Sequence, residues 1–151
     1  MKNIADTGLL KAALDRDDQA HVWAAGQLRE HAPFYTCEPV LDELAFLLGS
    51  AIPGLQLVVR GDLILAFDLA AEVKRVLDLL YKYRDRQMDL ADACLVRMTE
   101  LESRCKVWTV DRDDFQVYRR HGRQPVPCEF PPQKGGTINW QLGVRRGKGE
   151  P

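Results

Sequence analysis

Four acidic residues of this chain have the types and positions that metal chemistry requires. They are Asp6, Glu43, Asp92 and Asp111. Carboxylates that are brought together repel one another, so that some become protonated or a cation joins them. Hard divalent cations such as Mg²⁺ prefer oxygen ligands, and Mg²⁺ keeps part of its water shell, which leaves water to act as a nucleophile. The sequence therefore predicts one divalent-metal site, provided that the fold brings the four acids together.

Two of these acids close predicted strands. Asp6 ends the weakly apolar segment Asn3–Asp6 and is followed by Thr7 and Gly8, where glycine permits a sharp turn. Asp111 follows Lys106–Val110, a run with strong β propensity. In an open α/β sheet, ligands bind beyond the carboxyl ends of the strands. A loop aspartate after a strand is commonly only a helix cap, so either residue alone leaves both interpretations open.

The other two acids belong to predicted amphipathic helices. At 100° per residue, the apolar stripe of one helix is centred near Leu44, and Glu43 falls on its flank. Asp92 lies on the flank of the stripe of a later helix, and Asp89, three residues earlier, is on the same side but further from the core. Each of these acids could also be a plain boundary residue, so the metal-site hypothesis depends on convergence of the whole set.

Short apolar runs alternate with longer amphipathic segments, a pattern typical of an α/β domain with a mostly parallel central sheet flanked by helices. The predicted strands are Asn3–Asp6, Pro33–Thr36, Leu63–Phe67, Lys106–Val110 and Val126–Phe130. The predicted helices run from a cap at Asp17 or Asp18 to about Glu30, from a cap at Thr36 through Leu48, from Ala70 to about Arg84, and from Met88 to about Ser103.

Chain length predicts one domain, because 151 residues suffice for a single core. Residues 1–130 are expected to form this domain. Residues 131–151 are rich in turn formers and charge, with Trp140 as the one sizeable apolar group. They are expected to form a flexible tail, with a basic RNA-binding arm as the alternative.

The composition argues against several classes of protein. With 46% hydrophobic and 28% charged residues, the chain has a globular composition, and its apolar runs are too short to span a bilayer. Its start has no apolar stretch resembling a signal peptide, which predicts a cytoplasmic location. The four cysteines are widely spaced, so buried reduced thiols are favoured over a zinc site. The net charge of −1 does not by itself indicate a nucleic-acid binder.

The acidic segments, in their order along the chain, resemble the motifs of the PIN domains, and most closely the VapC-type toxins of bacterial toxin–antitoxin pairs. Residues 6–10 resemble the first motif of the family, and residues 17–21 resemble the start of its second helical segment. Residues 36–44 resemble the segment that carries the family's glutamate, which falls on Glu43. Residues 88–93 and 109–115 resemble the motifs of the third and fourth acids, which fall on Asp92 and Asp111.

The resemblance extends from about Asn3 to Phe130, with two departures from the family pattern. The first strand is less apolar than is usual. The closing motif carries an extra acid, so the secondary acid before the phenylalanine corresponds to Asp113 or Asp114. Asp114 is preferred, because it directly precedes Phe115.

The resemblance implies a three-layer PIN-like fold and a Mg²⁺-dependent endoribonuclease that hydrolyses phosphodiester bonds, with Mn²⁺ able to substitute. Asp6 and Asp92 would then hold the metal directly. Glu43 and Asp111 would complete the acidic set through water or a second metal, and could orient or deprotonate the attacking water. Asp89 and Asp114 would be outer acids, and Thr109 would hydrogen-bond within the site.

The implied partners are RNA, a small antitoxin protein and a second copy of the chain in a homodimer, with no membrane. Phosphate contacts supply most sequence-independent affinity for nucleic acid, so the site would need positive charge around it. The candidates for RNA contacts, chosen by position, are Arg84, Arg86, Arg112 and Arg119.

Other interpretations fit less well. A ribonuclease H-like fold begins with a long β-meander, whereas the region after Asp6 is predicted to be helical. An Asp-x-Glu exonuclease and an Asp-x-Asp phosphotransferase are both disfavoured, because Asp6 is followed by Thr7 and Gly8. The serious alternative is a PIN-like RNA-binding or scaffold protein with little or no nuclease activity.

Overall fold

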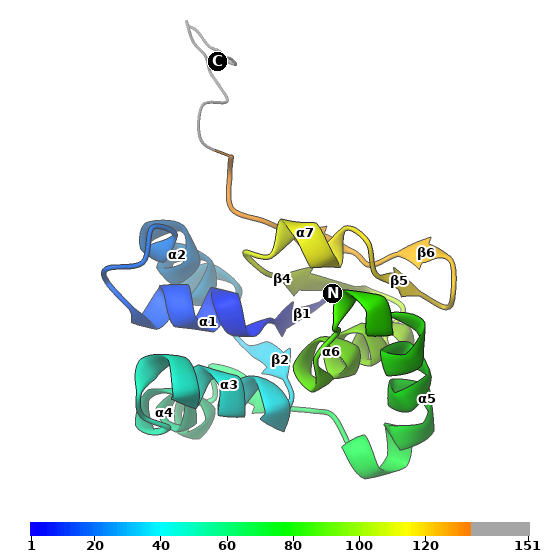
Figure 1. Cartoon of the computed structure of the whole chain (residues 1–151). Helices are drawn as coiled ribbons and strands as arrows, with labels where there is room; N and C mark the ends of the chain where they lie inside the picture. The colour runs from blue at the N-terminus through cyan, green and yellow to red at the C-terminus, as the bar shows by residue number, and fades with distance from the viewer. Residues whose placement is uncertain (134–151) are drawn as a thin grey trace, which may run out of the picture.

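Parallel strands form the middle of the molecule (Figure 1). The structure is a computed structural model, and it describes residues 1–133. Within these residues, five strands form one sheet in the order β3-β2-β1-β4-β7, and every pairing in it is parallel. The strands are β1 (Lys2–Ala5), β2 (Phe34–Thr36), β3 (Leu63–Leu65), β4 (Cys105–Trp108) and β7 (Cys128–Glu129). The predicted α/β class is confirmed.

Helices connect these strands, as parallel pairing requires. They are α1 (Thr7–Leu14), α2 (His21–His31), α3 (Glu38–Leu48), α4 (Ile52–Arg60), α5 (Leu69–Lys82), α6 (Leu90–Leu101) and the short α7 (Arg112–Phe115), with a 3₁₀ turn η1 (Arg84–Arg86). A small antiparallel hairpin, β5 (Arg119–Arg120) and β6 (Gln124–Pro125), follows α7. The predicted tail beyond residue 133, with Trp140, lies outside the described residues, and the division at residue 130 stays a prediction.

The strand order makes β1 the centre of the sheet. The chain runs outward from β1 to β2 and β3, and then returns to place β4 on the other side of β1. Ile4 on β1 consequently lies between Tyr35 on β2 and Val107 on β4. Such a reversal of strand order opens a crevice at the carboxyl ends of the two neighbouring strands, here β1 and β4.

Helix α6 is the most deeply buried helix of the described chain and carries an acid into the interior. Its residues 91–96 are all buried, and Asp92 is one of them. By contrast, α5 buries only Val76 and Leu79. Asp92 is therefore in surroundings where an unpaired charge is costly.

Two predicted helix caps are wrong. Helix α2 begins at His21, and its N-cap residue Ala20 has no side-chain bond, while Asp18 accepts a hydrogen bond from the N–H of Ala20 in the preceding turn. Thr36 does not cap α3, because it ends β2 and its hydroxyl donates to the carbonyl of Ala5 on the neighbouring strand at 2.9 Å. Tertiary contacts thus override the local capping pattern at both positions.

The structure also bears on the predicted state of the cysteines and on the length of the apolar segments. Cys37, Cys94 and Cys105 are buried, Cys128 is half-buried, and all four are free thiols. Across residues 1–133, every helix is too short or too polar to cross a lipid bilayer.

Candidate active site

Asp6 and Asp111 follow the two neighbouring strands at the reversal of strand order. β1 ends at Ala5 and β4 ends at Trp108, and the N–H of Asp6 donates to the carbonyl of Trp108 at 3.1 Å. Gly8 lies in α1 with no positive φ, so the prediction of a sharp glycine turn is wrong. The absence of a side chain matters instead for close approach, since a Cβ there would lie 2.5 Å from the side chain of Val110.

Asp6 is buried and held by two hydrogen bonds. Its Oδ1 accepts from the N–H of Thr7 at 2.7 Å, which caps α1, and its Oδ2 accepts from the Thr109 hydroxyl at 2.6 Å. Burial raises the pKa of Asp6 to about 6, although both hydrogen bonds lower it. Because the Thr109 hydroxyl also accepts from the N–H of Asp111 at 3.0 Å, it links two of the candidate acids.

Asp92 lies in the first turn of α6 and is only 9% exposed. Its Oδ2 accepts a hydrogen bond from the Tyr118 hydroxyl at 2.8 Å, and its N–H donates to Asp89, the N-cap residue of α6, at 2.8 Å. Burial, together with the charges of Asp6, Asp89 and Asp111, raises the pKa of Asp92 to about 8, although the hydrogen bond from Tyr118 lowers it. Asp92 is therefore largely protonated at neutral pH unless a cation joins it.

Glu43 reaches the same group of acids from α3. Its Oε1 accepts from the Thr7 hydroxyl at 2.7 Å. Burial, together with the nearby Asp89 and Asp6, raises the pKa of Glu43 to about 7, although the hydrogen bond from Thr7 lowers it.

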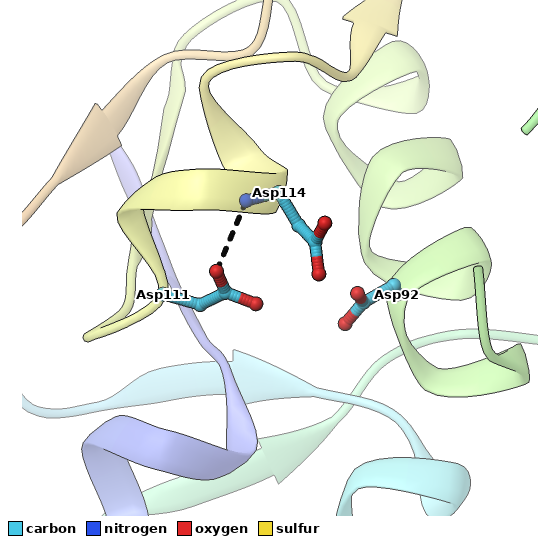
Figure 2. Close-up of side chains that lie close together, drawn as sticks. All are labelled: Asp92, Asp111 and Asp114. Atoms are coloured by element: carbon cyan, nitrogen blue, oxygen red, sulfur yellow. Dashed lines mark hydrogen bonds between the residues drawn. The ribbon is translucent and has the colours of Figure 1, made fainter. Parts of the chain in front are cut away.

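Asp92, Asp111 and Asp114 come closest to forming a metal site (Figure 2). Each offers one carboxylate oxygen, and these oxygens lie within 4.8 Å of one another. Asp92 comes from α6, whereas Asp111 precedes α7 and Asp114 lies within it, with the N–H of Asp114 donating to Asp111 at 3.0 Å. Burial raises the pKa of Asp111, and the neighbouring Asp114 adds to this effect.

This donor set fits a small divalent cation. All of its ligand atoms are carboxylate oxygens, the donors that Mg²⁺ prefers. The set differs from the expected one, because it contains Asp114, predicted as an outer acid. Asp6, expected as a direct ligand, lies beside it with both carboxylate oxygens already accepting hydrogen bonds.

The four predicted RNA-contacting arginines occupy different positions relative to the acids. Arg86 donates to Asp114 from two nitrogens, at 3.1 and 3.2 Å, and is the one predicted arginine that contacts a candidate acid within residues 1–133. Arg84 donates to the carbonyl of Tyr81, and Arg119 donates to three main-chain carbonyls after α7. Arg112 donates to the carbonyl of Pro131 and lies over the Phe130 ring at 4.8 Å.

A groove of about 690 Å³ runs beside the site, along α3 and the first turns of α5 and α6. Its lining includes Glu43 and Asp89 from the site, and three further acids, Glu38, Asp42 and Asp68, without any lysine or arginine. This side of the site is therefore strongly negative, and the positive charge of Arg86 enters from the other side, next to Asp114.

Two residues of the site were missed by sequence reasoning, namely Thr7 and Tyr118. Thr7 directly follows Asp6, and its hydroxyl binds Glu43 from a distant helix. Tyr118 stands seven residues after Asp111 and four after Asp114, so the three share one face of a helical segment. That spacing was the available signal for Tyr118.

The fold of this chain is similar to that of a solved protein structure. The chain is similar in structure to the VapC20 toxin of Mycobacterium tuberculosis, a sarcin-ricin loop cleaving toxin, with a TM-score of 0.66 and 18% sequence identity. The similarity covers 74% of this chain and 92% of VapC20. No family model matches the sequence, and no curated protein sequence matches it. The chain thus has the α/β fold of a VapC-type PIN domain, which is the fold that its ordered acidic motifs predicted.

Proposed function

We propose that this protein is a divalent-metal-dependent endoribonuclease and the toxin of a type II toxin–antitoxin pair. The observation that carries the proposal is the meeting of Asp92, Asp111 and Asp114 beside the buried Asp6, at the carboxyl edge of the sheet. The likeness to VapC20, an RNA-cleaving toxin, supports the same class of reaction.

The residues that would hold Mg²⁺ or Mn²⁺ are Asp6 and Asp92, with Asp111 and Asp114 completing the set. A divalent cation bound there polarises the scissile phosphate and favours deprotonation of the attacking water. Glu43 suits the role of proton acceptor, because burial and its acidic neighbours bring its pKa to about 7. The Thr7 hydroxyl, which donates to Glu43, orients Glu43 for this role.

Arg86 is the strongest of the four candidates for RNA contact. Its guanidinium group is bound to Asp114 in the metal-free protein. From this position beside the acids, Arg86 would bind a phosphate next to the scissile one. Single-stranded or looped RNA suits this arrangement, because its backbone can bend toward the acids, and the acidic groove would keep phosphates on the Arg86 side.

The proposal includes a cytoplasmic location, an antitoxin that blocks the site and a homodimer. Exposed apolar side chains on α3 and α4 are candidates for these protein contacts. They are Phe46, Leu47, Ile52, Leu55 and Val59. Apolar side chains gathered on one surface commonly mark a protein interface.

Cleavage of a looped RNA by the purified, antitoxin-free protein tests the proposal. Mg²⁺ or Mn²⁺ should support cleavage and EDTA should stop it, while DNA of the same sequence serves as the substrate control. Asp6→Asn and Asp92→Asn should be inactive, and Asp17→Asn, which changes an exposed acid outside the site, should be as active as wild type. Equal residual cleavage by wild type and Asp92→Asn would contradict the proposal.

A further inference from the structure

Tyr118 contacts the site without belonging to its acidic set. Its side chain is fully buried, and its hydroxyl donates to Asp92 Oδ2 at 2.8 Å. Its ring packs edge-on against Phe115 and Tyr83, with the ring centroids 5.2 and 5.1 Å away. The position of the hydroxyl is therefore set by the packing of the interior.

Tyr118 also belongs to the segment that carries two of the acids facing Asp92. Asp111, Asp114 and Tyr118 have the i, i+3, i+7 spacing of one helix face. Although α7 ends at Phe115, the N–H of Tyr118 donates to the carbonyl of Asp114 at 3.0 Å, which continues the helical turn. One face of this segment thus brings two carboxylates and one hydroxyl to Asp92 on α6.

We propose that Tyr118 is a positioning residue of the metal site, whose hydroxyl holds Asp92 at the distance from Asp111 and Asp114 that a shared divalent cation requires. The inference rests on the proposed metal-dependent function and extends it to a residue outside the acidic set. The hydrogen bond joins the α7 segment to α6, the two elements that supply the three closest ligand atoms.

The chemistry of a tyrosine hydroxyl suits this role. A carboxylate offers about four lone-pair sites, and one O–H donor occupies only one of them. A neutral hydroxyl orients Asp92 without cancelling its charge, whereas an arginine at the same place would compete with the cation. The other two buried contacts follow the same rule, because Thr109 donates to Asp6 and Thr7 donates to Glu43. Three acids from three elements are therefore each held by a neutral hydroxyl.

Tyr118→Phe tests the inference, because it removes the hydroxyl and keeps the ring. Tyr83→Phe is the matched control, since the Tyr83 hydroxyl belongs to the same aromatic cluster but accepts from the N–H of Arg119 at 2.8 Å. Mn²⁺ binding to the RNA-free protein, followed by electron paramagnetic resonance, is the readout. We expect Tyr118→Phe to weaken Mn²⁺ binding about tenfold, and Tyr83→Phe to stay within about twofold of wild type.

Thermal melting without metal separates positioning from folding. Both phenylalanine variants should lose similar, small amounts of metal-free stability, and only Tyr118→Phe should lose Mn²⁺ affinity. Equal Mn²⁺ affinity of the two variants would overturn the inference.

RNA cleavage, measured separately, distinguishes this inference from the proposed function. Metal binding that weakens in Tyr118→Phe, in a wild-type protein that cleaves no RNA, would support the inference and contradict the ribonuclease proposal. A wild-type protein that binds no Mn²⁺ would overturn both.

Discussion

Helix α6 carries a buried acid near each end, and the two acids have opposite electrostatic surroundings. Asp92, in the first turn, is 9% exposed, and the side chain of Glu100, in the last turn, is 1% exposed. Asp92 has acidic neighbours, and burial together with their charges raises its pKa to about 8. Glu100 is also penalised by burial, but hydrogen bonds from Arg75, the N–H of His121 and Arg97 lower its pKa to about 2.

The difference between the two ends of α6 shows that burial alone does not decide the direction in which the pKa of an acid shifts. At Glu100 the chain supplies its own cations, since Arg75 donates at 2.6 Å and Arg97 at 3.1 Å. At Asp92, residues 1–133 supply a neutral hydroxyl and further acids. The Glu100 end is electrostatically complete and has a structural role, whereas the Asp92 end would be completed by the divalent cation that we propose.

The largest expected effect is on RNA cleavage, and it should arise at one end only. Asp92→Asn should lower kcat at least about 1,000-fold, roughly 4 kcal/mol of transition-state stabilisation, because it removes a metal ligand. Single-turnover cleavage at saturating Mg²⁺ measures this loss. Folded Glu100→Gln protein should keep kcat within about threefold of wild type, and a comparable loss in both variants would remove the distinction between the two ends.

For the free energy of unfolding, the larger loss should come from Glu100→Gln and not from Asp92→Asn. Glu100→Gln should lower the free energy of unfolding by about 3 kcal/mol, because it leaves the charge of Arg75 without its carboxylate partner, whereas Arg97 keeps its ion pair with Glu72. Urea unfolding measures the loss, with Glu102→Gln as control, since Glu102 forms only an exposed pair with Lys2. Metal-free Asp92→Asn should be as stable as wild type or more stable, because it removes repulsion among acids.

The two ends of α6 should also differ in how pH changes the free energy of unfolding. The folded-state pKa values of Asp6, Glu43 and Asp92 are raised to about 6, 7 and 8, so the folded protein binds more protons than the unfolded chain. Metal-free stability should therefore fall as pH rises from about 4 to 8. At the Glu100 end the pKa is lowered, so stability should be lost as pH falls from about 4.5 toward 2.

Mg²⁺ should reduce the loss of stability at high pH, which arises at Asp6, Glu43 and Asp92. It should leave the loss of stability at low pH, which arises at Glu100, unchanged. At 100 times its dissociation constant, Mg²⁺ should stabilise the wild-type protein at pH 8 by about 2.7 kcal/mol, through binding to the folded state. Melting curves at a series of pH values, with Mg²⁺ or EDTA, measure both effects. Equal Mg²⁺ stabilisation of wild type and Asp92→Asn would show that the cation binds elsewhere.

The smallest expected effect concerns Arg86, which donates two hydrogen bonds to Asp114. Arg86→Gln should weaken RNA binding about fivefold at 0.1 M salt and reduce the slope of log Kd against log salt by about 0.7, as expected for one lost phosphate contact. Filter binding with the inactive Asp92→Asn protein measures this effect. Arg60→Gln, at the far end of α4, is the control, since Arg60 pairs with exposed Asp62. An unchanged slope would exclude Arg86 from the RNA path.

Much of the fold followed from local patterns. The apolar runs predicted four of the five strands of the parallel sheet to within a few residues, whereas β1 was placed mainly by the motif that begins at Asp6. The cap at Thr36 was wrong because its hydroxyl has a better partner on β1, which no local pattern contains. That Asp114 joins Asp92 and Asp111 in one group likewise depended on how α7 packs against α6.

The sequence by itself determined the order of the acidic motifs, the α/β class and the helix faces on which Glu43 and Asp92 lie, because strand and helix periodicities are local properties of the chain. Only the tertiary structure decided that Tyr118 holds Asp92, that Thr7 holds Glu43, and that Asp92 and Glu100 differ in charge state. These outcomes depend on partners brought from distant elements. Electrostatic energies depend on distances in space, which spacing along one helix does not specify.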